Sequence, residues 1–504
     1  MANVVIDKRD FSGPQAMNGY GWTVQELRWK AVGGCDTARL LVTCENGTAG
    51  LWRLADMLRC PVGVHAEGGP AWWGYVSGVE LHIDGRVAAV SLDEMGNSVA
   101  VNYEENRPDW WTAARTNTAF ATDADSVKVY GEKERMFGGG RMSSEQALAY
   151  RGSMLAEHSK PKMVLSNDLK AGSEQLKQAY AIVQARGWWE TLHWRYFADT
   201  RGREGDVRAG LVQAWGDAGE RLRLGQTFQT AETWRTQEIW VKLSAKAAVD
   251  GVYLSIYANE AGVPGAQLSG GWEASSPLGS DLEWARFPLS VELTLTAGTT
   301  YWLVLSRSGS VSATDYYRAG VDEQVHYPAG ALYVFNNVSG WAARVPAADL
   351  NFLLVGREET TTHLVRMLAS GEGGQFLSGY RLGLSSGVSW PMYRDGSQRA
   401  GEEIEAILRL GTSTGKRMLA HVDARRVLLL YAQPEAANSR VMIGVNGRLR
   451  GLDGELLKLS QQPAGQWARL LGLSPAGGLV GLQDLAWIEA VVWNGQEFLI
   501  EQED

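Results

Sequence analysis

The stretch Gly187-Trp-Trp-Glu-Thr-Leu-His-Trp-Arg-Tyr-Phe197 lies near the middle of the 504-residue chain and marks a change in its character. Leu192, Trp194 and Tyr196 alternate with Thr191, His193 and Arg195, and a period of two predicts a half-buried β-strand. The run 199–206 that follows is rich in glycine and charge, and a different kind of sequence begins after it. We therefore expect a scaffold that is interrupted by an inserted domain at the end of this strand.

Length and composition point to a soluble protein with several domains. A chain of 504 residues is too long for one hydrophobic core. Hydrophobic residues make up 45% and charged residues 21% of it, and glycine (59) and tryptophan (21) are unusually frequent. Many turns together with large flat side chains favour a β-rich fold with extensive contact surfaces.

Charge and cysteine usage exclude some partners. A net charge of -9 argues against adhesion to nucleic acid or anionic lipid, so DNA is expected only as passing cargo in a channel. Cys35, Cys44 and Cys60 form a sparse, odd set without metal-ligand spacing, which predicts free thiols. Because no signal-like start and no run of 18 apolar residues occurs, we expect synthesis in a cytoplasm without a membrane anchor.

The segment from Gly225 to Gly356 has the cleanest alternation in the chain. Turn pairs such as Asp250-Gly251 and Ala297-Gly298 separate strand-like runs, the pattern of an antiparallel β-sandwich. Phe352-Leu-Leu-Val355 would return the chain close to its point of departure, which favours an insertion. The apolar residues predicted to face this core are Ile239, Val241, Leu243, Val252, Leu254, Ile256, Phe287, Leu289, Val291, Leu293, Leu295, Tyr301, Leu303 and Leu305.

Two helices and two hairpins are predicted outside the insertion. Ser143 and Gln146 have the spacing of a capping box, so a helix should begin there and end before Pro161, with Leu148 among its packed residues. A second helix is expected within 397–410, followed by Gly411. The pairs Asn446-Gly447 and Asn494-Gly495 are strong signals of two-residue hairpin turns.

Several glycine and aromatic positions carry a family resemblance. They are Trp73–Val79, Asn97–Tyr103, Val129–Glu134, Gly187–Tyr196, Gln375–Tyr380, Tyr393–Gly396 and the run 402–426. In this order they resemble the tail hub proteins of long-tailed bacteriophages. The resemblance implies two related β-barrels per subunit and a homotrimer that forms a ring. It also implies contacts with a tail tube or distal tail protein and with tail tip or fibre proteins, in the tail tip of a virion.

The insertion resembles the "choice-of-anchor" β-sandwich modules of bacterial and phage surface proteins, through Gly225–Phe228 and Thr300–Trp302. Those modules are similar in shape to carbohydrate-binding modules, so aromatic side chains off the main core face could stack on sugar rings of a host-cell glycan. The alternative is that each of them packs in the core or a loop. The residues predicted for sugar stacking are Trp272, Tyr316, Tyr317, Tyr327 and Trp341.

The predicted fold is mainly β with a few helices, and combines hub-type β-barrel domains with an inserted antiparallel, jelly-roll-like sandwich. Five domains are expected. They are 1–135, an N-terminal hub barrel; 136–204, the first half of a second hub domain; 205–356, the inserted sandwich; 357–432, the second half of the second hub domain; and 433–504, a C-terminal hairpin region.

Motifs that would indicate catalysis are incomplete, and we expect no enzyme, no catalytic residues, no cofactor and no metal site. The run 411–417 is one residue short of a phosphate loop and lacks the hydroxyl residue after its lysine. The run 383–387 matches a nucleophile elbow but is followed by residues that disfavour a helix. Asp281 and Glu283 could be read as a glycosidase pair, but a solvated strand edge is the better explanation, because alternate residues of any strand share a face.

Three functions remain open from sequence. The first is a structural protein of a phage tail tip or baseplate, a trimeric hub whose inserted sandwich faces outward for host-glycan or fibre contact. The second is a glycan-binding lectin or glycan-active surface protein. The third is a cytoplasmic β-rich scaffold unrelated to phage. Mass in solution separates the first from the third, since only the hub is expected to form a ring.

Overall fold

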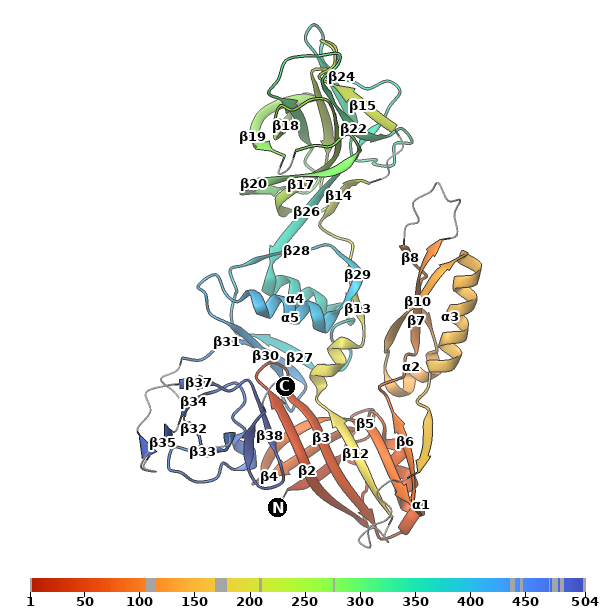
Figure 1. The fold of residues 1–504 in the computed structure, drawn as a ribbon, viewed down its shortest axis with the longest axis vertical. Helices are drawn as coiled ribbons and strands as arrows, with labels where there is room; N and C mark the ends of the chain where they lie inside the picture. The colour runs from red at the N-terminus through yellow and green to blue at the C-terminus, as the bar shows by residue number, and fades with distance from the viewer. Residues whose placement is uncertain are drawn as a thin grey trace. The chain divides into compact units, whose positions relative to one another are not determined.

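The computed structural model describes residues 2–105, 115–167, 179–207, 211–274, 277–435, 440–444, 447–470, 472–473, 479–480 and 485–501. The fold is mainly β with a few helices, as predicted (Figure 1). The chain forms two compact units. Unit 1 comprises Met1–Phe197, Leu364–Val388 and Ser397–Asp504, and unit 2 comprises Ala198–His363 and Ser389–Gly396. None of the described helices combines the length and the apolar composition needed to cross a membrane.

The largest sheet of unit 1 has ten strands, with β1-β4-β5-β12-β3-β2-β38-β39 in order and β6 and β11 branching from β5. Leu27 of β2 pairs with Trp493 of β38, so the two ends of the chain share one sheet. The strands are β1 (Asn3–Ile6), β2 (Tyr20–Lys30), β3 (Gly34–Cys44), β4 (Pro61–Ala66), β5 (Gly69–Ile83), β6 (Arg86–Ser91), β11 (Met163–Asn167), β12 (Tyr180–Arg186), β38 (Ala490–Trp493) and β39 (Phe498–Ile500).

This sheet corrects two predicted domain boundaries. β12 was assigned to a second domain beginning at 136, but it lies between β3 and β5, where its Ala181 and Val183 are buried. The C-terminal region 433–504 is likewise not separate, because β38 and β39 extend the N-terminal sheet. Pairing between strands far apart in sequence leaves no local signal, which is why the boundaries were wrong.

The stretch around Trp188 is not a strand. Trp188–His193 forms a 3₁₀ helix, η3, and the strand β13 (Tyr196–Asp199) begins only after it. Three residues per turn place Trp188 and Trp194 on one side. Both rings pack against Tyr75 and Phe376, with centroids 5.3 to 5.9 Å apart. Packing against aromatic residues from two segments of unit 1, Met1–Phe197 and Leu364–Val388, therefore overrides the strand that the period of two predicted.

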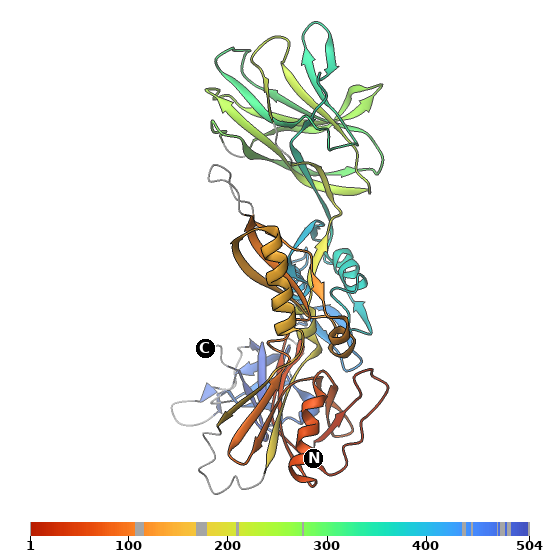
Figure 2. The ribbon, with the colours of Figure 1, turned by 90° about the vertical axis from the view of Figure 1, so that its right-hand side faces the viewer.

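The predicted first helix is present as α3 (Ser144–His158), and Ser143 and Gln146 form its capping box. In Figure 2 it lies along two strands of a small sheet, β7 (Ser98–Glu105) and β10 (Glu134–Met142). Ala147 of the helix packs against Val101 and Tyr103. Leu148 was expected to pack there as well, but it is 45% exposed, because the next residue along a helix is turned by about 100° from Ala147 and lies at the flank of the packed face.

The rest of unit 1 follows the sequence closely. The second predicted helix is α5 (Ala400–Leu410), with Ile404, Ile407 and Leu408 buried and Gly411 after its end at φ 70°. β38 and β39 form a hairpin that contains Asn494-Gly495, but its loop has the four residues 494–497 and not the predicted two, since Trp493 pairs with Phe498. Of the other turn pair, Asn446 lies outside the described residues. Further elements include α1 (Gly47–Trp52), η1 (Arg53–Met57), β8 (Arg115–Asn117), β9 (Ala121–Thr122), α2 (Ala124–Tyr130), β27 (Gly379–Leu382), β30 (Met418–Val422), β31 (Val427–Ala432), β32 (Val441–Ile443), β33 (Leu449–Gly451), η6 (Leu459–Gln461), β34 (Trp467–Leu470), β35 (Gly472–Leu473), β36 (Leu479–Val480) and β37 (Leu485–Trp487). Two more, α4 (Thr360–Ala369) and β29 (Arg394–Arg399), include residues of both units.

One row of core residues runs off the edge of the large sheet. Val42, Ala181, Leu81, Ala88 and Leu165 face one another across five strands, β3, β12, β5, β6 and β11. Their exposed fractions rise from 0% at Val42 to 6% at Ala88 and 69% at Leu165. The apolar face of the sheet is thus uncovered at β11, whose only neighbour in the described part of the chain is β6.

Unit 2 contains an antiparallel sandwich. One sheet has the order β14-β26-β17-β22-β15, joined by β20, β25 and β28, and the other has the order β19-β18-β21-β16-β23-β24. Every residue predicted to face its core is buried or packs against the core, except Val291, which is 69% exposed. The strands are β14 (Arg203–Asp206), β15 (Leu211–Trp215), β16 (Arg223–Phe228), β17 (Trp234–Lys246), β18 (Val252–Glu260), β19 (Val263–Glu273), β20 (Glu283–Leu295), β21 (Tyr301–Arg307), β22 (Tyr316–Asp322), β23 (Leu332–Asn336), β24 (Gly340–Ala343), β25 (Asp349–Leu350), β26 (Phe352–Glu359) and β28 (Ser389–Pro391).

The strands by which the chain enters and leaves the sandwich are neighbours. β14 pairs with β26, with Arg203 opposite Val355 and Asp206 opposite Phe352. Unit 2 extends beyond the predicted range 205–356, because β28, from 389–391, adds to the outer part of β26. Three residues of strand carry too little pattern for sequence to assign them.

Candidate functional site: an aromatic face of the sandwich

Three of the five residues predicted for sugar stacking belong to the core. Trp272, Tyr317 and Tyr327 are only 7%, 2% and 6% exposed. The Tyr327 hydroxyl donates to the Gln229 carbonyl at 3.0 Å, and the Tyr317 hydroxyl donates to the Asp250 carbonyl. Burial raises the pKa of Tyr317 to about 12. The prediction is wrong for these three, because a ring enclosed on both faces cannot stack on a ligand.

Tyr316 is half-buried at the start of β22. The ammonium group of Lys246 lies 5.0 Å from its ring centroid. One face of Tyr316 is therefore covered by a cation–π contact. The contact between Lys246 and Tyr316 involves none of the other four residues predicted for sugar stacking.

Trp341 is the predicted residue that lies in an aromatic cluster. Its ring centroid is 5.5 Å from that of Trp302 and 5.2 Å from that of Phe335, and Tyr333 lies 4.5 Å from Trp302. Trp302 is fully buried, whereas Tyr333, Phe335 and Trp341 are half-buried. We call these four residues the aromatic face.

Strand alternation places the aromatic face on the outside of the six-stranded sheet. Leu303 and Leu305 of β21 point into the core. Trp302 precedes Leu303 in the same strand, and since successive side chains alternate, it points outward. Gly225 of β16 lies beneath the rings, since a Cβ there would come within 2.7 Å of Trp341. The sequence analysis missed Tyr333 and Phe335. The signal was their alternation with Leu332, a core residue, and Val334, which packs against the core.

Polar groups line the rim of the aromatic face. The Trp302 indole N–H donates to Asn259 Oδ1 at 2.9 Å, which fixes the ring. The guanidinium carbon of Arg223 lies 5.5 Å from the Phe335 ring centroid, and the Arg223 side chain is exposed. Flat rings beside hydrogen-bonding groups form the kind of surface that binds sugars.

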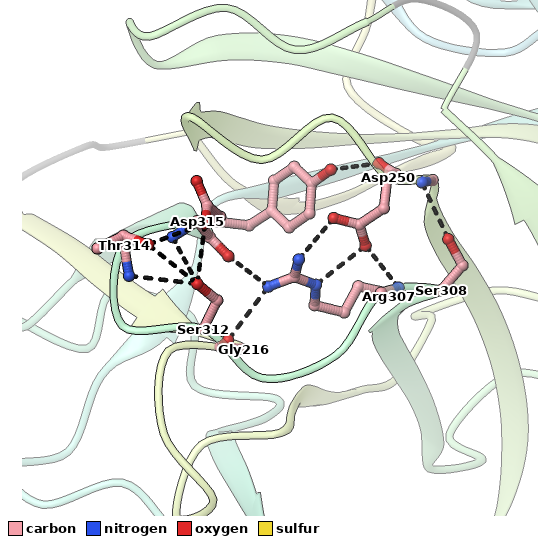
Figure 3. A network of polar contacts seen from close by, with 10 residues as sticks. Gly216, Asp250, Arg307, Ser308, Ser312, Thr314 and Asp315 are labelled. Atoms are coloured by element: carbon pink, nitrogen blue, oxygen red, sulfur yellow. Dashed lines mark hydrogen bonds and ion pairs between the residues drawn. The ribbon is translucent and has the colours of Figure 1, made fainter.

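The loops at one end of the sandwich are joined by Arg307 (Figure 3). Its guanidinium donates to both Asp250 carboxylate oxygens at 3.0 and 2.6 Å, and to the carbonyls of Gly216 and Asp315 at 3.1 and 2.7 Å. The Gly309 N–H adds a bond of 2.7 Å to Asp250. Three loops, β15–β16, β17–β18 and β21–β22, are thereby held together at this end.

The network predicts acid sensitivity. Burial alone would raise the pKa of Asp250, but hydrogen bonds from Arg307 and Gly309 outweigh it and lower the pKa. A lowered pKa stabilises the fold above the unfolded-state value of about 3.9, and this stabilisation is lost as the pH falls further. We expect the free energy of unfolding of unit 2 to decrease between about pH 5 and pH 2. The decrease should be smaller in Asp250→Asn, as measured by urea unfolding at each pH; equal slopes would contradict the assignment.

Unit 1 contains an open cleft of about 1240 Å³, lined by the β2–β3 turn, η3, α5 and C-terminal residues. Charged groups on its wall are paired. His193 Nε2 lies 3.4 Å from Glu405, and Arg417 donates to Glu489 at 2.8 and 2.9 Å. The hydrogen bond from His193 lowers the pKa of Glu405. A lowered pKa favours the ionised form of Glu405, so the cleft presents a charged and polar wall.

Comparisons with known proteins leave the family open. No protein-family model and no curated protein matches the chain. Among solved structures, the chain is similar to the mosquito-larvicidal Cry4Aa toxin of Bacillus thuringiensis, with 7% sequence identity and a TM-score of 0.15. The match covers 59% of this chain and 51% of the toxin. A T13 particle of IBDV is 9% identical with a TM-score of 0.17, over 73% of this chain and 83% of the other. The chain spans about half the length of the two Bacillus toxins that it matches, Cry4Aa and Cry8Ea1. TM-scores this low support no conclusion about the fold or function of this chain.

Proposed function

We propose that this chain is a structural protein of a phage tail tip or baseplate. In this proposal unit 1 assembles into a trimeric hub between the tail tube and the tip or fibre proteins, and unit 2 contacts the host surface. The observation that carries the proposal is topological. A scaffold whose first and last strands share one sheet is interrupted by a sandwich that begins and ends in paired strands.

Self-association is supported by the exposed edge at β11. Met163, Val164 and Leu165 are all more than 40% exposed, and they continue a sheet whose inner rows are buried. An edge strand of this kind has unpaired backbone groups and apolar side chains, and it readily pairs with another chain. A hub of several subunits would cover this edge, whereas a monomer leaves it in solvent.

The mass of the purified protein in solution tests the assembly. A trimer has three times the subunit mass of 55.1 kDa, and class-averaged electron micrographs should show a ring with an axial opening. A protein that stays monomeric at every concentration would refute the hub. It would leave the second reading, a glycan-binding protein, which the aromatic face favours.

Removing the sandwich tests the insertion. Because Asp206 lies opposite Phe352, residues 207–351 can be replaced by Asn-Gly, a turn that joins directly paired strands. Phe352→Ser and Leu354→Thr remove core side chains that the deletion would expose. We expect unit 1 to stay folded and to keep its assembly state, as measured by circular dichroism and light scattering.

The full-length chain with the same two substitutions is the matched control. Both residues are fully buried, so unit 2 should unfold in that control while unit 1 does not. Precipitation of the deletion protein under conditions where the full-length chain is soluble would show that the sandwich is not an insertion.

A further inference from the structure

Arg223 is the cation of the aromatic face. Its position opposite Phe335 on β16 and β23 places both side chains on the outer side of the sheet, together with Gly225 and Tyr333. Arg223 is exposed and makes no ion pair within the described residues. Its guanidinium covers the Phe335 ring at 5.5 Å, so the N–H groups at its edge are free to meet a ligand.

Along its own row of the sheet, Arg223 is well separated from the next charged side chain. On the same row of the sheet, Arg223 is followed by Ser306, Tyr253 and then Glu273. Three strand spacings separate Arg223 from Glu273, or roughly 14 Å. At that distance the two exposed charges are largely screened by salt. Along this row Arg223 is therefore the charged group beside the Phe335 ring, although the chain as a whole carries -9.

A ligand that suits this surface has both a flat apolar side and an anionic group. Sugar rings present C–H faces to tryptophan and tyrosine, and a carboxylate accepts two parallel hydrogen bonds from a guanidinium. A neutral sugar would offer Arg223 only hydroxyl oxygens and would not form the charge-assisted bidentate pair. A nucleic acid would need several cations along its backbone, and this row supplies one.

We propose that the aromatic face binds acidic glycans, sugars that carry a carboxylate, with Arg223 contacting that carboxylate and Trp341, Tyr333 and Phe335 supporting the sugar rings. This inference deepens the proposed function, since it rests on unit 2 being the part that contacts a host surface. Trp302 is buried beneath the other rings, and Asn259 at the rim fixes its orientation through the hydrogen bond from the indole N–H. Arg223 determines specificity, because only it distinguishes charged from neutral sugars.

The test uses the full-length protein and isothermal titration calorimetry with two pairs of probes. Tetragalacturonate is compared with its fully methyl-esterified form, and sialyllactose is compared with lactose. In the first pair the carboxylate charges are removed while the sugar rings are retained. In the second pair the acidic ring is removed with its charge while the lactose part is retained. We expect at least one acidic probe to bind about tenfold more tightly than its neutral partner, the effect of one charge-assisted pair. High salt should reduce this difference.

Variants identify the residues. Arg223→Gln should abolish the preference for the acidic probe, and Arg223→Lys should restore part of it. Trp341→Ala should weaken binding of every probe, while Trp284→Ala, an exposed tryptophan on the other sheet, should change nothing. Because Trp341 also packs against its neighbours, Trp341→Ala is interpreted only if its melting temperature equals that of the unmodified protein. Arg223 is exposed, so Arg223→Gln is not expected to change the stability.

The outcomes separate this inference from the hub proposal. Equal affinity for acidic and neutral probes, an unchanged preference in Arg223→Gln, or no binding of either acidic probe would overturn the inference. The masses of the same samples report on assembly independently. A ring that does not bind acidic sugars refutes only the inference, and a monomer that binds them refutes only the hub.

Discussion

Replacing Arg307 by methionine should destabilise unit 2 by about 3–5 kcal/mol, because it leaves the carboxylate of Asp250 without its cation. The Arg307 side chain is only 8% exposed, and four hydrogen bonds from it reach three loop segments. Methionine fills a similar volume but donates none of these bonds. Chemical denaturation followed by circular dichroism should show the transition of unit 2 at a lower denaturant concentration, with unit 1 unaffected.

Arg286→Met is the matched control in the same unit. Arg286 also pairs with a carboxylate, that of Glu238, at 2.7 Å, but its side chain is 48% exposed. An exposed pair is worth at most about 1 kcal/mol. If both substitutions cost the same, the network in Figure 3 is not what holds the loops together. The double variant Arg307→Met with Asp250→Leu should recover part of the loss, since no buried charge then remains unpaired.

Trp194→Ala should destabilise unit 1 by about 3–5 kcal/mol, the range for truncating a buried tryptophan. Trp194 is 2% exposed, and its ring meets those of Tyr75 and Phe376 edge to face at 5.6 and 5.5 Å. These partners come from segments on both sides of the insertion. The substitution should therefore weaken the whole unit, as measured by hydrogen exchange of β5 and β12.

The control for this prediction is Trp52→Ala. Trp52 belongs to the same unit but is 44% exposed, and its loss should cost less than about 1 kcal/mol. Protection of β5 that survives Trp194→Ala would show that the aromatic packing around η3 is not central to unit 1.

Sequence predicted the fold best where structure is local. The sandwich core of unit 2, the capping box at Ser143 and the helix ending at Gly411 all follow from spacing within one element. Sequence failed where distant segments decide. The period of two at 192–196 gave way to packing on Phe376, and β12 joined a sheet that no local pattern indicates.

The candidate site was predicted only in part, for a related reason. Core-facing and outward-facing aromatic residues look alike in sequence, and only the strand register separates Tyr317 from Tyr333. Trp341 was predicted as an aromatic residue off the core face, whereas Phe335 and Arg223 gain their roles from pairing across β16 and β23. Burial then excluded Trp272, Tyr317 and Tyr327.

The pairing of β14 with β26 has an evolutionary consequence. Genetic recombination that replaces everything between Asp206 and Phe352 changes a whole cassette while the two strands at its base keep their hydrogen bonds. Any incoming module whose own termini lie about 5 Å apart can occupy the same position, since that is the distance between neighbouring strands. Specificity for a new surface can then be acquired in one step, without selection for compensating changes elsewhere in the protein.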